Sequence, residues 1–235
     1  MGKATPDYIL GNQLALIGRR PAIGFGTDEF HVREIPRDQA NDIVMANHYS
    51  GRVYSGTTIH LGLIVTGELV GVLQFGYAMN PASQQGVVRG TPITGYLELN
   101  RMWIDDSCGR NTESRALSYA IKFIRRERPD VEWIQSFADE RCGLFGTVYQ
   151  AAGFDYLGEH MGAFWELDGE TYHKSLADRT AGAGRRGAYL RANISRARLL
   201  KLRQFRYIRF LKKGARKRLV LTIQPYPKPD YAAGR

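Results

Sequence analysis

The sequence predicts a mixed α/β fold, a central sheet flanked by helices, with a basic C-terminal extension. Between residues 28 and 169, apolar runs of strand length alternate with segments of helical periodicity. Of 33 Lys and Arg residues, 14 lie between Arg185 and Arg218, a segment without Asp or Glu. These observations predict a lead-in segment (1–27), an α/β domain (28–169) and a basic extension (170–235).

The first half of the α/β domain predicts a strand, a helix and a hairpin. Pro36 ends the strand, and Asp38 can cap the helix. A turn at Thr66-Gly67-Glu68 separates two apolar runs, as in a β-hairpin. The predicted elements are a strand over Phe30–Ile35, a helix from Asp38 to about Asn47, hairpin strands over Thr58–Val65 and Leu69–Phe75, and a long loop over 77–94.

The second half continues the alternation of strands and helices. Leu117, Ala120, Ile121 and Ile124 have the spacing of one buried helix face, and Pro129 ends that helix. The predicted elements are strands over Tyr96–Ile104 and Val131–Phe137, a helix from Thr112, a short helix over Gly146–Ala152, and strands over Phe154–Leu157 and Ala163–Leu167.

The basic extension predicts contact with a polyanion. Outside Arg185–Arg218 the chain holds 19 basic and 23 acidic residues, so the net charge of +10 belongs to this segment. The bland alternative is a solvated charged surface. Expected elements are a helix over Glu170–Arg179, a linker over Ala181–Gly187, a basic helix over Tyr189–Leu202 and a hairpin of Phe205–Leu211 with Leu219–Ile223; expected nucleic-acid contacts are Arg191, Arg196, Arg198, Lys201, Arg203 and Arg206.

A strand, a Gly/Arg turn and a helix follow one another from Tyr96 onward, and Tyr149 precedes a Gly-Phe pair. This arrangement resembles the GNAT-type acyltransferases, although the turn carries less glycine than is usual there. The resemblance implies an acyl donor such as acetyl-CoA, with its pyrophosphate at Gly109, Arg110 and Asn111. A glycine-derived carrier is the alternative donor.

Several separated segments resemble the Mom family of phage DNA-modification proteins. They are Asn47-His48-Tyr49-Ser50, Leu99-Asn100-Arg101-Met102-Trp103, Phe137-Ala138-Asp139-Glu140-Arg141, and Tyr149 with its Gly-Phe sequel. The resemblance implies that adenine in double-stranded DNA is converted to its N6-carbamoylmethyl form. It also implies protection of phage DNA from restriction in the cytoplasm of the infected host.

This chemistry needs a positioned set of polar groups, because the adenine amine is a poor nucleophile and the base must leave the stack. We expect Asp139 to accept a proton or orient His48, and His48 to serve in acid/base chemistry. Arg101 would bind an anion, Tyr149 would protonate a leaving group, and Tyr49 would stack on the everted base. Each has a structural alternative: a turn aspartate, a surface histidine, a salt bridge of Arg101 with Glu98 or Asp139, and packed tyrosines.

A metal site is a further hypothesis. His48, Asp139 and Tyr149 together could bind iron, since the new carbon–nitrogen bond is an alkyl bond that plain acyl transfer does not form. The alternative functions are a small-molecule or protein N-acyltransferase with a basic arm, and a non-catalytic DNA-binding protein. A homodimer is possible, and no membrane partner is expected, because no apolar run approaches the ~20 residues of a membrane helix.

Overall fold

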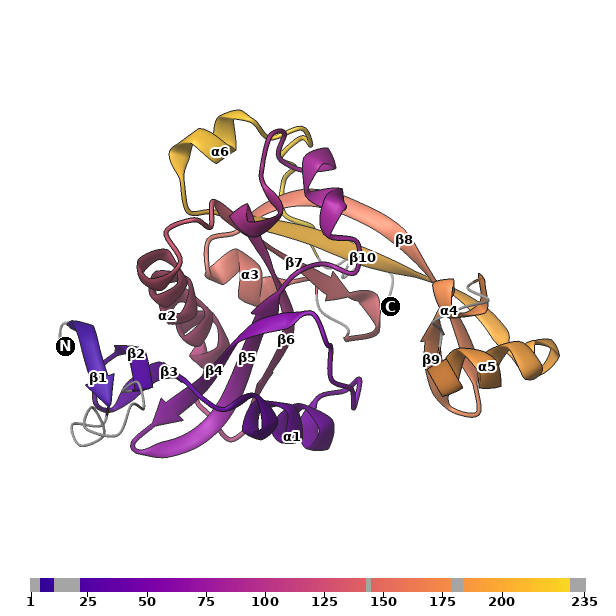
Figure 1. Cartoon of the computed structure of the whole chain (residues 1–235), viewed down its shortest axis with the longest axis horizontal. Coiled ribbons are helices and arrows are strands. Elements are labelled where there is room, and N and C mark those ends of the chain that lie inside the picture. Colours follow the sequence, from indigo (N-terminus) through magenta and orange to yellow (C-terminus); the bar gives the residue numbers. More distant parts are fainter. Residues whose placement is uncertain (1–4, 11–21, 143–144, 179–183, 229–235) are drawn as a thin grey trace.

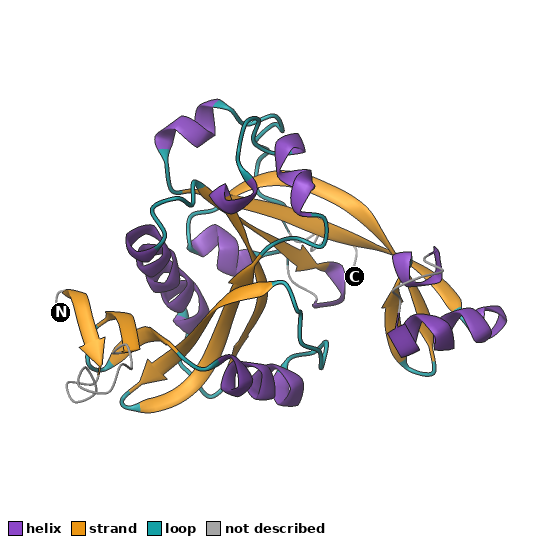
Figure 2. Cartoon of the chain, in the orientation of Figure 1, coloured by secondary structure: helices purple, strands orange, loops and turns teal. Residues whose placement is uncertain are grey.

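The computed structural model describes residues 5–10, 22–142, 145–178 and 184–228. One ten-stranded sheet runs through this part of the chain in the order β1-β2-β3-β4-β5-β6-β7-β10-β8-β9 (Figure 1). Helices cover both faces of the sheet, so the predicted mixed α/β fold is confirmed (Figure 2). No helix of the described residues is long and apolar enough to span a membrane.

The N-terminal half forms an antiparallel meander. The expected lead-in contributes two strands, β1 (Thr5–Leu10) and β2 (Ala22–Gly26), that extend the sheet beyond β3 (Phe30–Glu34). The predicted hairpin is present as β4 (Thr57–Val65) and β5 (Glu68–Gly76). Its two turn residues have positive φ angles, Thr66 at 48° and Gly67 at 89°, which suits the twist of a tight hairpin.

The two faces of the sheet are covered by different helices. On one face α2 (Thr112–Glu127) buries its apolar stripe, which includes Leu117 and Ile121, in the main core. On the other face α1 (Arg37–Asn47) buries Ala40 and Val44 against β5. Both helices were predicted from their periodicity, and both are confirmed.

One pair of neighbouring strands, β6 (Tyr96–Ile104) and β7 (Trp133–Asp139), is parallel. They pair with each other over three residues, Tyr96–Glu98 with Trp133–Gln135, and beyond these residues each pairs only with its other neighbour, β6 with β5 and β7 with β10. Antiparallel pairs join the other neighbours. The sheet therefore opens between the C-terminal halves of β6 and β7.

The basic segment forms only the first four residues of the expected basic helix, Tyr189–Ala192 within α5 (Gly184–Ala192), and the expected hairpin is absent from its described residues. Residues Arg198–Phe210 form the long strand β10, which lies between β7 and β8 (Asp155–Leu167) and pairs with both. Phe205 and Tyr207 of β10 are 1% and 0% exposed in the main core. The boundary expected after residue 169 therefore does not separate two units, because burying these aromatics requires β10 inside the sheet.

β8 is one strand of 13 residues where two short strands were predicted. Its C-terminal half and the first half of β10 run as a two-stranded ribbon to a small lobe (Figure 1). The lobe consists of β9 (Glu170–His173), α4 (Ser175–Asp178) and α5 (Gly184–Ala192) around buried Leu167, Tyr172 and Leu190. Of the helix expected over Glu170–Arg179, the first four residues form β9 and Ser175–Asp178 form α4. In the linker expected over Ala181–Gly187, the described residues from Gly184 onward belong to α5.

The long loop after β5 and the end of the chain cover the remaining sheet face. Val87 and Val88 of the loop pack with Trp133 and Ile208 in a second cluster. Leu219 bridges to Val88 but starts no strand, so the hairpin expected at Leu219–Ile223 is wrong. The short elements here and elsewhere are η2 (Pro81–Gly86), η3 (Ile93–Gly95), η4 (Glu140–Cys142), α3 (Thr147–Ala151), η5 (Ile194–Arg196) and α6 (Lys213–Lys217).

Candidate active site

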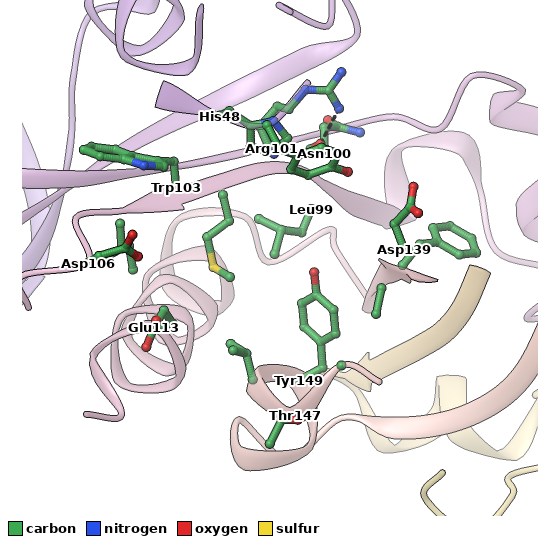
Figure 3. Close-up of a pocket in the computed structure, with 17 residues that line it drawn as sticks. His48, Leu99, Asn100, Arg101, Trp103, Asp106, Glu113, Asp139, Thr147 and Tyr149 are labelled. Carbon is green, nitrogen blue, oxygen red and sulfur yellow. Dashed lines mark hydrogen bonds between the residues drawn. The ribbon is translucent and has the colours of Figure 1, made fainter. Parts of the chain in front are cut away.

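A cavity of about 390 Å³ lies where β6 and β7 separate (Figure 3). Such a volume is in the range of small-molecule sites. Six consecutive residues of β6 line it, together with the end of β7, the start of α3 and the loop after α1. All five predicted catalytic residues, His48, Tyr49, Arg101, Asp139 and Tyr149, are among the lining residues.

A bulge in β6 explains how so many neighbouring residues reach one cavity. Gln74 of β5 pairs with Arg101, but Phe75 pairs with Leu99, so Asn100 is an extra residue in the ladder. A bulge of this kind re-aims the side chains around it. Leu99, Asn100 and Arg101 all line the cavity as a result.

Tyr149 is held by aromatic packing at the start of α3. Its ring lies 5.3 Å from that of Tyr207 and 5.7 Å from that of Phe154, between ring centroids. Gly146 begins this helix with a φ of 77°, and a Cβ there would collide with the ring of Tyr207. The hydroxyl of Tyr149 points into the cavity, toward Leu99 (Figure 3).

Asp139, the last residue of β7, is 6% exposed and bound by a neighbouring arginine. Arg141 donates from Nε to Oδ1 at 2.9 Å and from Nη2 to Oδ2 at 2.5 Å, and its main-chain N–H donates to Oδ1 at 3.0 Å. Burial opposes ionisation, but the hydrogen bonds from Arg141 and Gln204 together with the charge of Arg141 outweigh it and lower the pKa of Asp139. The carboxylate therefore stays ionised near neutral pH.

His48 follows the last turn of α1. Its Nδ1 accepts a hydrogen bond from the main-chain N–H of Ser50 at 3.1 Å, so a neutral ring carries its proton on Nε2. Burial, and then the charge of Arg101, lower the pKa of His48 to about 4. At neutral pH the side chain is a neutral hydrogen-bond donor through Nε2, which limits its expected acid/base role.

Arg101 makes neither of the salt bridges that were considered for it. Its Nε donates to the carbonyl oxygen of Arg52 at 3.0 Å, and its Nη1 donates to the carbonyl oxygen of Asn100 at 2.6 Å. Burial lowers the pKa of Arg101, since a charged guanidinium is partly removed from water. Tyr49 is 64% exposed at the cavity, and its ring lies 4.3 Å from that of His48.

Glu98 is a buried carboxyl group next to the site. It accepts hydrogen bonds from Gln135 Nε2 at 2.8 Å and Asn100 Nδ2 at 3.3 Å. Burial raises its pKa to about 7, although both hydrogen bonds and the charges of Arg206 and Arg101 oppose the rise. Glu98 is therefore partly protonated near neutral pH. It directly precedes Leu99, which lines the cavity.

The expected donor-binding residues Gly109, Arg110 and Asn111 form the exposed turn before α2. Asn111 takes the left-handed conformation, with a φ of 67°, and a Cβ at Gly109 would meet nothing within 4 Å. The turn does not itself line the cavity, but Asp106 before it and Glu113 after it do. The cavity therefore extends toward the N-terminus of α2.

The six expected DNA contacts have varied surroundings. Three are ion-paired: Arg196 with Asp168 at 2.5 Å, Arg198 with Glu166 at 2.6 Å, and Arg203 with Glu140 at 2.9 Å. Arg191 donates to the carbonyl oxygen of Leu176, Arg206 lies 5.1 Å from the ring centroid of Phe137, and Lys201 is exposed. Their contact with DNA stays a prediction.

The residues predicted to bind iron do not fit a metal ion. Both oxygens of Asp139 are engaged by the cationic Arg141, which would also repel a metal cation. Nδ1 of His48 accepts from the main-chain N–H of Ser50 and Nε2 carries the proton of the neutral ring, so neither nitrogen offers a lone pair to a metal ion. No group of three His, Cys, Asp or Glu in the described residues could hold a metal ion.

No role was predicted from the sequence for Arg141, although this residue ends the segment Phe137–Arg141 that carries the family resemblance. Arg141 joins the site to the lobe, since its Nη1 donates to Oγ1 of Thr171 at 2.7 Å. Its guanidinium also lies 4.9 Å from the ring centroid of Phe164 and 5.8 Å from that of Tyr49. The two-residue spacing after Asp139 was the one available signal.

Comparison with known proteins gave matches at both sequence and structure level. The model of the Mom protein family matches residues 29–228. The chain is 49% identical to the methylcarbamoylase of Escherichia phage Mu over an alignment of 231 residues. This alignment covers 97% of this chain and 96% of that protein.

Among solved structures, the ribosomal-protein-S5-alanine acetyltransferase of Vibrio fischeri is similar, with a TM-score of 0.48, 11% identity and coverage of 81% of this chain and 97% of that chain. An acetyltransferase of Salmonella typhimurium that modifies the N-terminal serine of ribosomal protein L7/L12 has a TM-score of 0.47, with 13% identity and coverage of 79% and 97%.

Proposed function

Because this chain belongs to the Mom protein family, we propose that it is a DNA-modifying transferase that converts adenine to its N6-carbamoylmethyl form. The observation that carries the proposal is the convergence of His48, Tyr49, Arg101, Asp139 and Tyr149 on one cavity. Its purpose would be to shield phage DNA from restriction inside the infected bacterial cell.

The roles of the residues follow from their charge states. The ionised Asp139 accepts a hydrogen bond from the adenine amine, and Arg141 keeps it in place. His48 donates from Nε2 to an acceptor on the base or the donor. Tyr149 protonates the leaving group of the donor, and the exposed ring of Tyr49 stacks on the everted base.

The donor enters from the other end of the cavity in this proposal. Its anionic part lies at the start of α2, where unpaired N–H groups of a first helical turn favour negative charge. A Cβ at Gly109 would meet nothing within 4 Å, which leaves room there, and Arg110 adds a positive charge to the turn between Asp106 and Glu113. Acetyl-CoA has an anionic part suited to this position, but its acetyl group lacks the amide nitrogen of a carbamoylmethyl group and would need an oxidant and a nitrogen source. A glycyl group from a glycine-derived carrier has the same atoms as a carbamoylmethyl group, so a rearrangement from the acyl to the alkyl bond on N6 would complete the transfer.

The test is nucleoside mass spectrometry of plasmid DNA after expression of the chain in bacteria. We expect carbamoylmethyladenine with the wild-type chain and at least a ~100-fold loss with Asp139→Asn or Tyr149→Phe, the usual size of an acid–base contribution. Both substitutions preserve shape, so the variants should still fold.

Tyr119→Phe is the matched control for Tyr149→Phe, since Tyr119 packs outside the cavity against Phe25 and Phe30. Unchanged adenine with the wild-type chain would refute the proposed activity. Full modification by Asp139→Asn would remove that residue from the chemistry.

A further inference from the structure

Three arginines converge where the lobe meets the catalytic core. Arg52 follows α1, Arg101 lies on β6, and Arg186 lies on α5 of the lobe. We propose that Arg52, Arg101 and Arg186 form a phosphate-binding site that grips the DNA backbone beside the target nucleotide. This inference rests on the proposed function, because it takes DNA as the molecule whose base enters the cavity.

Arg52 and Arg186 share a single carboxylate. Both ion-pair with Oε2 of Glu170, at 3.0 Å and 2.5 Å. Both also donate to the carbonyl oxygen of Thr171, at 3.1 Å and 3.4 Å, and both lie over the ring of Tyr172, at 5.9 Å and 4.2 Å from its centroid. The two guanidinium groups are therefore fixed close together, and one carboxylate oxygen neutralises only part of their charge.

Arg101 adds a third positive charge without adding a negative one. Its hydrogen bonds go to two main-chain carbonyl oxygens, one of which belongs to Arg52 itself. Among the described residues, Glu170 is the one carboxylate that forms an ion pair with any of the three arginines. The site thus has a surplus of positive charge that a bound anion would balance.

The arginines are also crowded in a way that an anion would relieve. Burial lowers the pKa of Arg52, and the neighbouring charges of Arg186 and Arg101 lower it further, against the opposing charge of Glu170. The side chains of Arg52 and Arg186 remain 35% and 37% exposed, so a ligand can reach them. Guanidinium groups bind phosphate oxygens through paired hydrogen bonds, which a phosphodiester accepts well.

The position of the cluster favours a phosphate of DNA over a phosphate of the donor. Arg101 lies at the end of the cavity with His48 and Asp139, whereas Asp106 and Glu113 lie toward α2 (Figure 3). Tyr49, the proposed stacking residue, lies at the same end, because its ring centroid is 4.3 Å from that of His48, whose pKa the nearby charge of Arg101 lowers. A backbone phosphate next to an everted nucleotide would therefore lie beside Tyr49, at the arginine cluster.

The experiment compares two double variants of the full chain that remove equal charge. Arg52→Gln/Arg186→Gln disrupts the cluster, and Arg128→Gln/Arg216→Gln removes two arginines that each have their own carboxylate and are not among the six predicted DNA contacts. Duplex DNA affinity is measured by fluorescence anisotropy from about 50 to about 200 mM NaCl. We expect the first variant to lower the slope of log affinity against log salt by about 1 to 2, and the control to lower it by less than half as much.

The inference is overturned if both double variants lower the slope equally, or if the cluster variant leaves it unchanged. Arg52→Lys/Arg186→Lys keeps the charge and should retain most of the salt slope. This result, together with an unchanged melting temperature of the Gln variant, would show that the loss of slope is not caused by misfolding. Loss of coenzyme A binding with intact DNA binding would assign the cluster to the donor instead and also overturn it.

Adenine modification is measured by mass spectrometry on the same preparations. A wild-type chain that shows the expected salt slopes but never modifies adenine would support the phosphate site and refute the proposed function. If the wild-type chain modifies adenine but the cluster variant shows no change in salt slope, the proposed function is supported and the phosphate site is refuted.

Discussion

His48 shows how a local contact decides what a residue can do. The main-chain N–H of Ser50 occupies Nδ1, and burial beside Arg101 disfavours the charged ring. A histidine in a loop after a helix, taken from the sequence alone, titrates near neutrality and suits proton transfer. In the folded chain the same residue stays neutral, so its contribution at pH 7 is a directed hydrogen bond.

A pH-dependent stability follows from this environment. With a pKa of about 4 in the folded chain, against 6.5 for the free side chain, the unfolded chain takes up a proton on His48 first as pH falls. The free energy of unfolding should therefore decrease between pH 6.5 and 4, with no contribution from His48 above that window. Urea midpoints at pH 7 and pH 5 measure this effect, and His48→Asn should show a smaller decrease than the wild type. An identical decrease in both chains would contradict the assigned environment.

The site residues divide into those that sequence could find and those that it could not. His48, Asp139 and Tyr149 lie in segments that carry the family resemblance, and all three line the cavity. Arg52 and Arg186 lie outside these segments. Their significance comes from sharing Glu170, which is 118 residues after Arg52. Pairings over such distances depend on the path of β8 and β10, which no local pattern encodes.

At the scale of elements, strand β10 is where sequence-based prediction was wrong. Leu and Arg favour helices, and a basic helix was predicted over Tyr189–Leu202, but of this range Tyr189–Ala192 are α-helical and Arg198–Leu202 lie in β10. Pairing of Arg198–Phe210 with both β7 and β8 overrides this preference. By contrast α2, β4 and β5 were predicted well, since their periodicity and turn residues are local signals.

The position of β10 predicts the outcome of truncation. A chain that ends after residue 197 should fail to fold, because it lacks a strand between β7 and β8. A dispensable arm would instead leave a folded enzyme with weaker DNA binding. Solubility and far-ultraviolet circular dichroism distinguish these results, and a soluble, cooperatively melting truncation would refute the structural role of β10.

A pair of point substitutions on β10 tests the same role in the full chain. Phe205→Ala, at a side chain that is 1% exposed, should cost about 3–5 kcal/mol of unfolding free energy. Leu199→Ala on the same strand, at 44% exposure, should cost less than about 1 kcal/mol. Equal costs at the two positions would contradict the placement of Phe205 in the core.

At the scale of the whole molecule, the chain combines a large sheet core with a lobe that has its own small core. Leu167, Tyr172 and Leu190 form that cluster, and the ribbon of β8 and β10 connects it to the sheet. A cluster of this size stabilises little by itself, so the lobe should open at a lower free energy than the core. The contacts from Arg52 and Arg141 to Thr171 add to its attachment.

Leu190→Ala tests whether the lobe is a separate unit of stability. Leu190 is 0% exposed, so removing its side chain should cost about 2–5 kcal/mol, enough to open the lobe but not the sheet core. Hydrogen exchange should then accelerate over 170–178 and 184–196 while β4 to β7 keep their protection, and DNA affinity should fall because Arg186 loses its fixed position. Ile194→Ala, at 37% exposure in the same region, should change neither. If β4 to β7 lost protection together with the lobe, the two would form one cooperative unit, and the arginine cluster would owe its geometry to the entire fold.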